Sequence, residues 1–85
     1  MARTFPAWKA WASARLLEIA KGAKEDKVRR DADILLTKIQ YLRLESLPSF
    51  LALLHAASQD DPSFLDLAPT SSEVETWFAE EVKEG

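Results

Sequence analysis

Apolar residues recur at intervals of three and four positions from residue 5 to residue 45, and this spacing constrains the fold more than any other feature of the chain. It matches the 3.6-residue turn of an α-helix and places the apolar side chains of each segment on one face. Runs of Val, Ile and Thr that alternate with polar residues, as expected for strands, are missing. The pattern predicts an all-α fold: a compact bundle of about four helices, three longer and one shorter, with no sheet.

Residues that start or stop helices divide the chain into segments. Gly22 is the expected end of the first helix because glycine readily takes the left-handed conformation of a C-cap. The alternative is a helix that runs through Gly22 at a cost of about 1 kcal/mol relative to alanine. Since 85 residues are enough for one core only, we expect a single helical domain over residues 1–85. Its expected helices are 5–22, 25–45, 47–58 and 72–83, with a connector at 59–71.

Capping patterns support these boundaries. Thr4 suits the start of the first helix, and Asp61 before a proline suits a short turn within the connector. Two overlapping capping boxes, Thr70–Glu73 and Ser72–Glu75, precede the last helix.

The segment 47–58 separates large from small residues. At 100° per residue, its Leu and Phe side chains share one face, whereas the opposite face carries Ser49, Ala52 and Ala56. Two interpretations stay open. Either the small face contacts solvent, or it packs closely against another helix or another chain.

The small size of the chain bears on assembly. A chain of 85 residues builds little core and, with no Cys, has no disulfide to supplement it. We therefore expect a homo-oligomer, most simply a dimer. The absence of Cys fits a reducing, cytoplasmic setting. No apolar run approaches the roughly 18 residues of a membrane span, and the first residues show no signal-peptide pattern, so no membrane is expected among the partners.

Several apolar side chains exceed what one stripe per helix needs. Trp11 and Leu17 lie off the first stripe, and Ile34 and Tyr41 form a second face on the second helix. Aromatic residues flanked by Arg are enriched in protein interfaces, and Arg15 lies one helical turn from Trp11. We therefore expect a non-enzymatic protein-interaction module, such as a small regulator or inhibitor that binds a larger protein, itself or both. The expected interface residues are Trp8, Trp11, Arg15, Arg30, Ile34 and Tyr41. The alternative for Trp8, which lies on the stripe, is a place in the core.

Charge is unevenly distributed along the chain. Residues 1–43 hold ten basic and five acidic residues, whereas residues 44–85 hold one basic and nine acidic residues. This asymmetry raises a second hypothesis, a nucleic-acid-binding accessory protein that uses its basic first helix. Its phosphate contacts would come from Lys9, Arg15, Lys21 and Lys24. The net charge of −3 opposes this hypothesis. Part of the basic charge is also expected in helix-surface ion pairs, Asp26 with Arg30 and Arg29 with Asp33.

No pattern in the chain indicates catalysis. His55 is the single His, there is no Cys nucleophile, and the two glycines form no phosphate-binding loop. One His near loosely spaced Asp residues lacks the ligand density of a metal site. We therefore expect no catalytic residue, no metal and no cofactor.

Overall fold

The computed structural model describes the backbone of residues 3–84 and the side chains of residues 3–81. This part of the chain is helical and contains no strand, so the predicted all-α fold is confirmed. The elements in chain order are α1 (Phe5–Gly22), α2 (Asp26–Gln40), the 3-10 helix η1 (Leu44–Ser46), α3 (Leu47–Ala57), the 3-10 helix η2 (Pro62–Leu67) and α4 (Ser71–Glu84).

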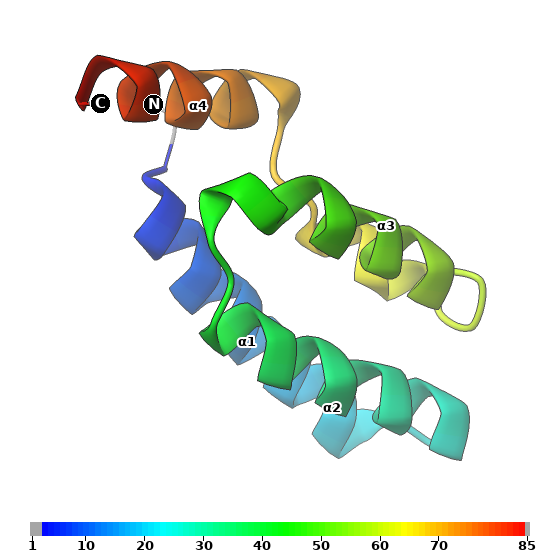
Figure 1. The fold of residues 1–85 in the computed structure, drawn as a ribbon. Helices are drawn as coiled ribbons and strands as arrows, with labels where there is room; N and C mark the ends of the chain where they lie inside the picture. The colour runs from blue at the N-terminus through cyan, green and yellow to red at the C-terminus, as the bar shows by residue number, and fades with distance from the viewer. Residues whose placement is uncertain (1–2, 85) are drawn as a thin grey trace.

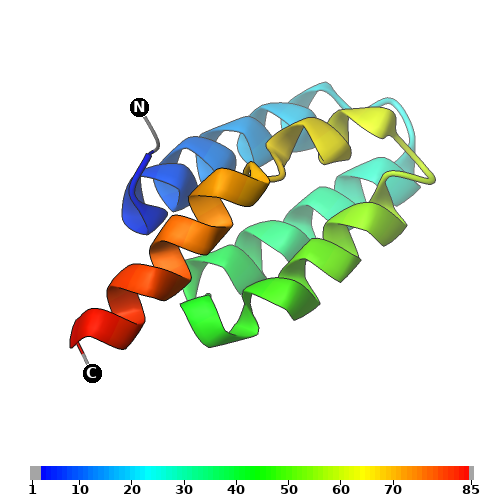
Figure 2. The same ribbon diagram turned by 90° about the horizontal axis from the view of Figure 1, so that it is seen from above.

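Four elements form a closed ring around the core. Figures 1 and 2 show α1 and α2 as an antiparallel pair, with α3 returning beside α2 and η2 lying beside α3 and α1. The order around the ring is therefore α1, α2, α3, η2. In this ring the seam between α2 and α3 lies opposite the seam between α1 and η2. The last helix, α4, lies across the end of the ring where α1 and α3 begin (Figure 1).

The caps form where the sequence predicts them. Thr4 Oγ1 accepts a hydrogen bond from the amide of Ala7, and the Asp61 carboxylate accepts one from the amide of Ser63. Of the two overlapping capping boxes, Thr70–Glu73 forms, because Thr70 and Glu73 exchange hydrogen bonds between side chain and backbone. As a result α4 begins at Ser71, one residue earlier than expected.

The second helix is shorter than expected. It ends at Gln40 rather than near residue 45, because Tyr41 leaves helical geometry and Arg43 is extended. This break lets the chain reverse so that α3 runs back beside α2. The buried side chain of Leu42 holds the break against the core.

Gly22 ends the first helix by a different route from the one expected. The chain leaves the helix through Ala23, which is extended, and no glycine in the part of the chain described has a positive φ. The left-handed glycine cap is therefore absent at this position.

The core extends through the ring and under α4. Trp8, Leu16, Leu35, Ile39, Leu47, Leu54 and Phe64 are the largest fully buried side chains. In α3 the large residues face this core, whereas Ser49, Ala52 and Ala56 are exposed. The small face of α3 therefore has no covering element in the part of the chain that the structure describes.

Candidate protein-interaction surfaces

Trp8 belongs to the core and is not available as an interface anchor. Its side chain has no exposed surface, and its indole Nε1–H donates a 2.8 Å hydrogen bond to the carbonyl oxygen of Leu67. Its ring packs against Phe5, Phe50 and Trp77. The place of Trp8 on the apolar stripe therefore explains its burial, and the prediction that Trp8 is an interface residue is wrong.

Trp11 lies at the α1–η2 seam with a different arginine from the one expected. The Arg3 guanidinium carbon is 4.7 Å from the centre of the Trp11 ring, whereas Arg15 pairs with Glu18 at 3.1 Å. A hollow of about 270 Å³ opens beside Trp11, and Asp66 of η2 lies in its wall. This hollow mixes one basic and two acidic side chains with its apolar ones.

Ile34 and Tyr41 lie at the opposite seam, beside α3. Tyr41 is 80% exposed and Ile34 is 46% exposed. A hollow of about 340 Å³ is lined by Thr37, Lys38, Tyr41 and Leu42 together with Ser49, Phe50 and Leu53, among others. A second hollow of about 170 Å³ is lined by Asp31, Ile34, Leu35, Leu53, Ala56 and Ala57. These two hollows, with Leu53 shared between them, are called the α2–α3 face from here on.

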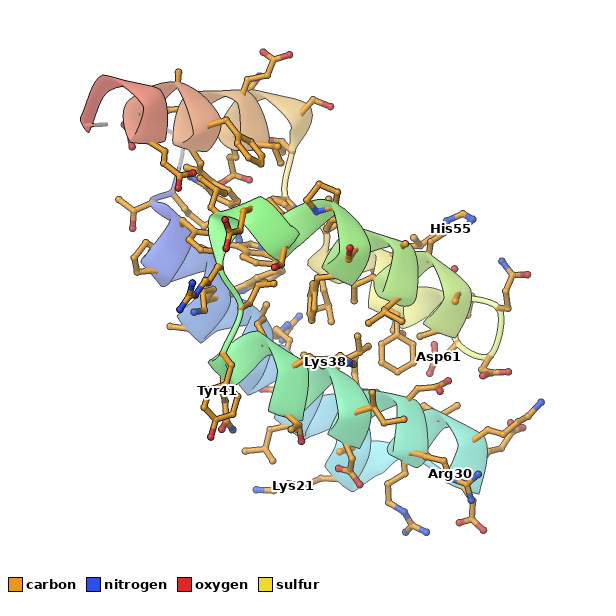
Figure 3. All side chains as sticks on the ribbon, in the orientation of Figure 1. Lys21, Arg30, Lys38, Tyr41, His55 and Asp61 are labelled. Atoms are coloured by element: carbon orange, nitrogen blue, oxygen red, sulfur yellow. The ribbon has the colours of Figure 1, made fainter. Side chains whose placement is uncertain are left out.

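The structure thus divides the predicted interface between two opposite surfaces. Trp11 and Arg15 are at the α1–η2 seam, and Ile34 and Tyr41 are on the α2–α3 face. Figure 3 places Arg30 on α2 away from α3, so it borders the face rather than lining it. One partner surface therefore cannot cover all six predicted residues.

Leu53 is the exposed apolar residue of the face that the sequence did not single out as an interface residue. It is 38% exposed and lines both hollows, so it forms the ridge between them. Its helical position beside the apolar stripe of α3 is visible in the sequence. The sequence does not predict which helix packs beside α3. Leu53 lies next to Ile34 only because α3 packs beside α2.

The α2–α3 face has opposite charges at its two ends. Lys38 is the one charged residue that lines the larger hollow, and Asp31 is the one that lines the smaller hollow. Figure 3 shows Lys38 between α2 and α3. In the part of the chain that the structure describes, Lys38 forms no ion pair.

Asp31 is in an unfavourable setting for a carboxylate. Burial and the neighbouring carboxyl of Asp60 raise its pKa, while Lys27 and Arg30 act in the opposite direction. Lys27 Nζ itself lies 3.7 Å from Asp60. When Asp31 and Asp60 are both ionised, neither carboxylate can donate a hydrogen bond to the other. Oδ2 of Asp31 is then buried with no hydrogen-bond partner. A proton or a cationic group near Asp31 would relieve this arrangement.

The predicted phosphate contacts do not gather into one patch. Lys9 Nζ donates to the carbonyl oxygen of Leu42 at 2.9 Å, and Arg15 is paired with Glu18. Lys24 borders a hollow that is also lined by acidic residues, and Lys21 projects from the end of α1 (Figure 3). These four basic side chains therefore lie in different surroundings, two of which include carboxylates.

Two other ion pairs differ from those expected on α2. Arg29 pairs with Asp26 at 2.6 Å, one turn earlier, instead of with Asp33. Arg30 has no ion pair within residues 3–81. The i,i+3 pairing replaces the predicted i,i+4 pairs.

The end covered by α4 contains polar contacts that the sequence did not predict. Glu73 accepts hydrogen bonds from the Arg3 side chain at 2.8 and 2.9 Å, and Trp77 Nε1–H donates to the carbonyl oxygen of Arg3 at 2.7 Å. The hydrogen bonds from Arg3 and from the backbone of Thr70 lower the pKa of Glu73 to about 2. These contacts join residues about 70 positions apart in the chain, so no local pattern reveals them.

Among the residues that the structure describes, no group of three or more His, Asp or Glu side chains is arranged to hold a metal ion. His55 is exposed and points away from α2 (Figure 3). The described helices include none with the length and apolar character that a membrane crossing requires.

Comparison of the chain with protein-family models, with curated proteins and with solved structures finds no match.

Proposed function

We propose that this protein is a non-enzymatic protein-interaction module that binds through the α2–α3 face. The observation that carries the proposal is the line of exposed Ile34, Leu53 and Tyr41 across two adjoining hollows. Exposed apolar surface that is continuous over two helices is typical of interfaces, whereas single exposed apolar residues are normal on any protein. The same face supports both versions of the hypothesis, a regulator or inhibitor of a larger protein and a unit that binds its own copies.

Helix geometry adds support. Ile34 on α2 and Tyr41 at its C-cap are seven residues apart, about 10 Å along the helix axis. The small residues of α3 leave room for a partner to approach closely. A rigid helical surface with one ridge and two hollows is a form that helical partners fit.

The experiment compares two double variants that each replace two exposed apolar side chains with glutamate. Ile34→Glu with Tyr41→Glu places charge on the α2–α3 face. Leu17→Glu with Leu65→Glu places the same charge elsewhere, at side chains that are 47% and 46% exposed. Affinity capture from cells that express the protein, followed by mass spectrometry, is run with wild type and both variants. We expect the face variant to lose captured proteins, including its own copies, that the control variant retains. Loss of the same proteins from both, or from neither, contradicts the proposal.

The nucleic-acid hypothesis has weaker support, because the basic side chains of α1 do not converge. It predicts salt-sensitive binding that Arg15→Glu with Lys21→Glu abolishes. A gel-shift titration at low salt with single-stranded and duplex probes tests it. No shift at low salt would exclude this alternative.

A further inference from the structure

The two ends of the α2–α3 face are complementary to each other in charge. Lys38 lines the larger hollow and Asp31 the smaller, seven residues apart on α2, with Leu53 of α3 between the hollows. A second copy placed face to face, with its helices antiparallel to those of the first, sets the Lys38 end of each copy against the Asp31 end of the other. The twofold axis of this arrangement lies in the plane of contact and runs across the helices.

We propose that a second copy of this chain covers the α2–α3 face in an antiparallel, twofold-symmetric dimer that pairs Lys38 of each copy with Asp31 of the other. This inference rests on the proposed function, because it names the partner that occupies the same face.

Charge selects this arrangement over the other symmetric one. With the twofold axis parallel to the helices, each Lys38 would oppose its own counterpart and each Asp31 likewise. Like charges at an interface cost free energy, whereas opposite charges fix the register. In the antiparallel arrangement, Lys38 of the second copy adds a cation on the side of Asp31, whose Oδ2 has no hydrogen-bond partner within one chain.

The apolar part of the face fits the same arrangement. The Leu53 ridges of the two copies meet near the axis, and the exposed Ser49 and Ala56 on either side of each ridge let the two α3 helices approach closely. The small face of α3 then contacts another chain, one of the two interpretations that the sequence left open.

A dimer interface of ordinary size needs only a small part of the surface of this chain. A standard interface buries about 800 Å² per partner, and the whole chain exposes 5780 Å². An interface of this size would therefore cover about one seventh of the surface of each copy.

The test is a charge swap measured by analytical ultracentrifugation. Wild type is expected to show a concentration-dependent dimer. Lys38→Glu and Asp31→Lys are each expected to raise the dimer Kd about thirtyfold, because each variant homodimer loses both charge pairs at about 1 kcal/mol per pair. An equimolar mixture of the two variants is expected to form a heterodimer tighter than either homodimer, because both charge pairs are restored in it. Far-UV circular dichroism verifies that each variant is folded.

Lys21→Glu is the matched control, since it makes the same charge change on exposed α1 and is expected to leave the Kd unchanged. A monomeric wild type at several hundred micromolar, or a mixture that associates no better than the single variants, overturns the dimer. Neither result contradicts the proposed function, which fails if the capture experiment gives the same result for the face variant and the control variant.

Discussion

The end of the molecule under α4 and the α2–α3 face both contain large apolar side chains and polar groups, but the two regions differ in burial and in hydrogen bonding. Under α4, the aromatic rings are buried, and the indole N–H groups of Trp8 and Trp77 each donate a hydrogen bond to a backbone carbonyl. On the α2–α3 face, apolar side chains are exposed, and a carboxyl oxygen of Asp31 has no hydrogen-bond partner. In the first region the chain itself buries the apolar side chains and pairs the polar groups. In the second region apolar side chains like those of a core remain exposed to solvent. Stability should therefore depend on the first region and association on the second.

The largest expected effect is in the covered region. Trp8→Ala removes a fully buried ring and its hydrogen bond to Leu67, and we expect it to lower the free energy of unfolding by about 3 to 5 kcal/mol. Urea denaturation followed by circular dichroism measures this loss. Trp11→Ala, the same substitution at a partly exposed ring, is the control and should cost about 1 kcal/mol or less. Equal losses would contradict the distinction between the two tryptophans.

This pair of tryptophans also illustrates how far the sequence predicts the molecule. The 3.6-residue period identifies all four helices and places Trp8 on the buried stripe, and side-chain chemistry locates the caps at Thr4, Asp61 and Thr70. These are local properties, set within a few residues of each position. The order of the elements around the ring depends on the free energy of the whole core. The sequence therefore did not predict that Trp11 and Ile34 lie on opposite surfaces.

The next effect concerns acid stability at the same end. The pKa of Glu73 is about 2 in the folded protein, against an ordinary value of 4.5. A carboxyl with a lowered folded pKa stabilises the fold above its unfolded pKa, and this contribution is lost as pH falls from about 4.5 toward 2. We expect a loss of about 2 kcal/mol, reduced from the full linkage value because Arg3 is partly exposed to solvent.

The matched variant for this prediction is Glu73→Gln. It removes the ionised partner of Arg3, so it should lose a similar amount of stability at pH 7 and should then be less sensitive to pH between 5 and 2. Chemical denaturation at a series of pH values compares the two proteins. An unchanged pH dependence would show that the Arg3–Glu73 pair does not secure α4.

A smaller effect of opposite sign is expected on the open face. Because the pKa of Asp31 is raised in the folded protein, its ionised form opposes folding, and wild type should gain stability from this group as pH falls through that pKa. Asp31→Asn supplies an amide that donates to Asp60, so it should stabilise the monomer at pH 7 by about 1 kcal/mol and remove this gain. Thermal unfolding at low micromolar concentration tests this without a contribution from association. A destabilised variant would mean that the Asp31 carboxylate is satisfied in the monomer.

The smallest expected effect on stability is at Tyr41. This side chain is 80% exposed, so Tyr41→Ser should change the free energy of unfolding by no more than about 0.5 kcal/mol. The same variant should weaken binding by any partner that covers the α2–α3 face, which a titration by calorimetry or ultracentrifugation would measure. A large stability loss without a binding effect would place Tyr41 with the core residues and reverse the comparison.

The contact between the first residues and α4 has a consequence for synthesis on the ribosome. The chain emerges from its N-terminus, so α1 and α2 can pair early, since they are neighbours in sequence. The acceptor for the Trp8 indole is Leu67, and the ring that covers Trp8 belongs to Trp77. The surroundings of Trp8 therefore cannot be completed until Leu67 and Trp77 have left the exit tunnel, which is well after α1 and α2 have emerged and can pair.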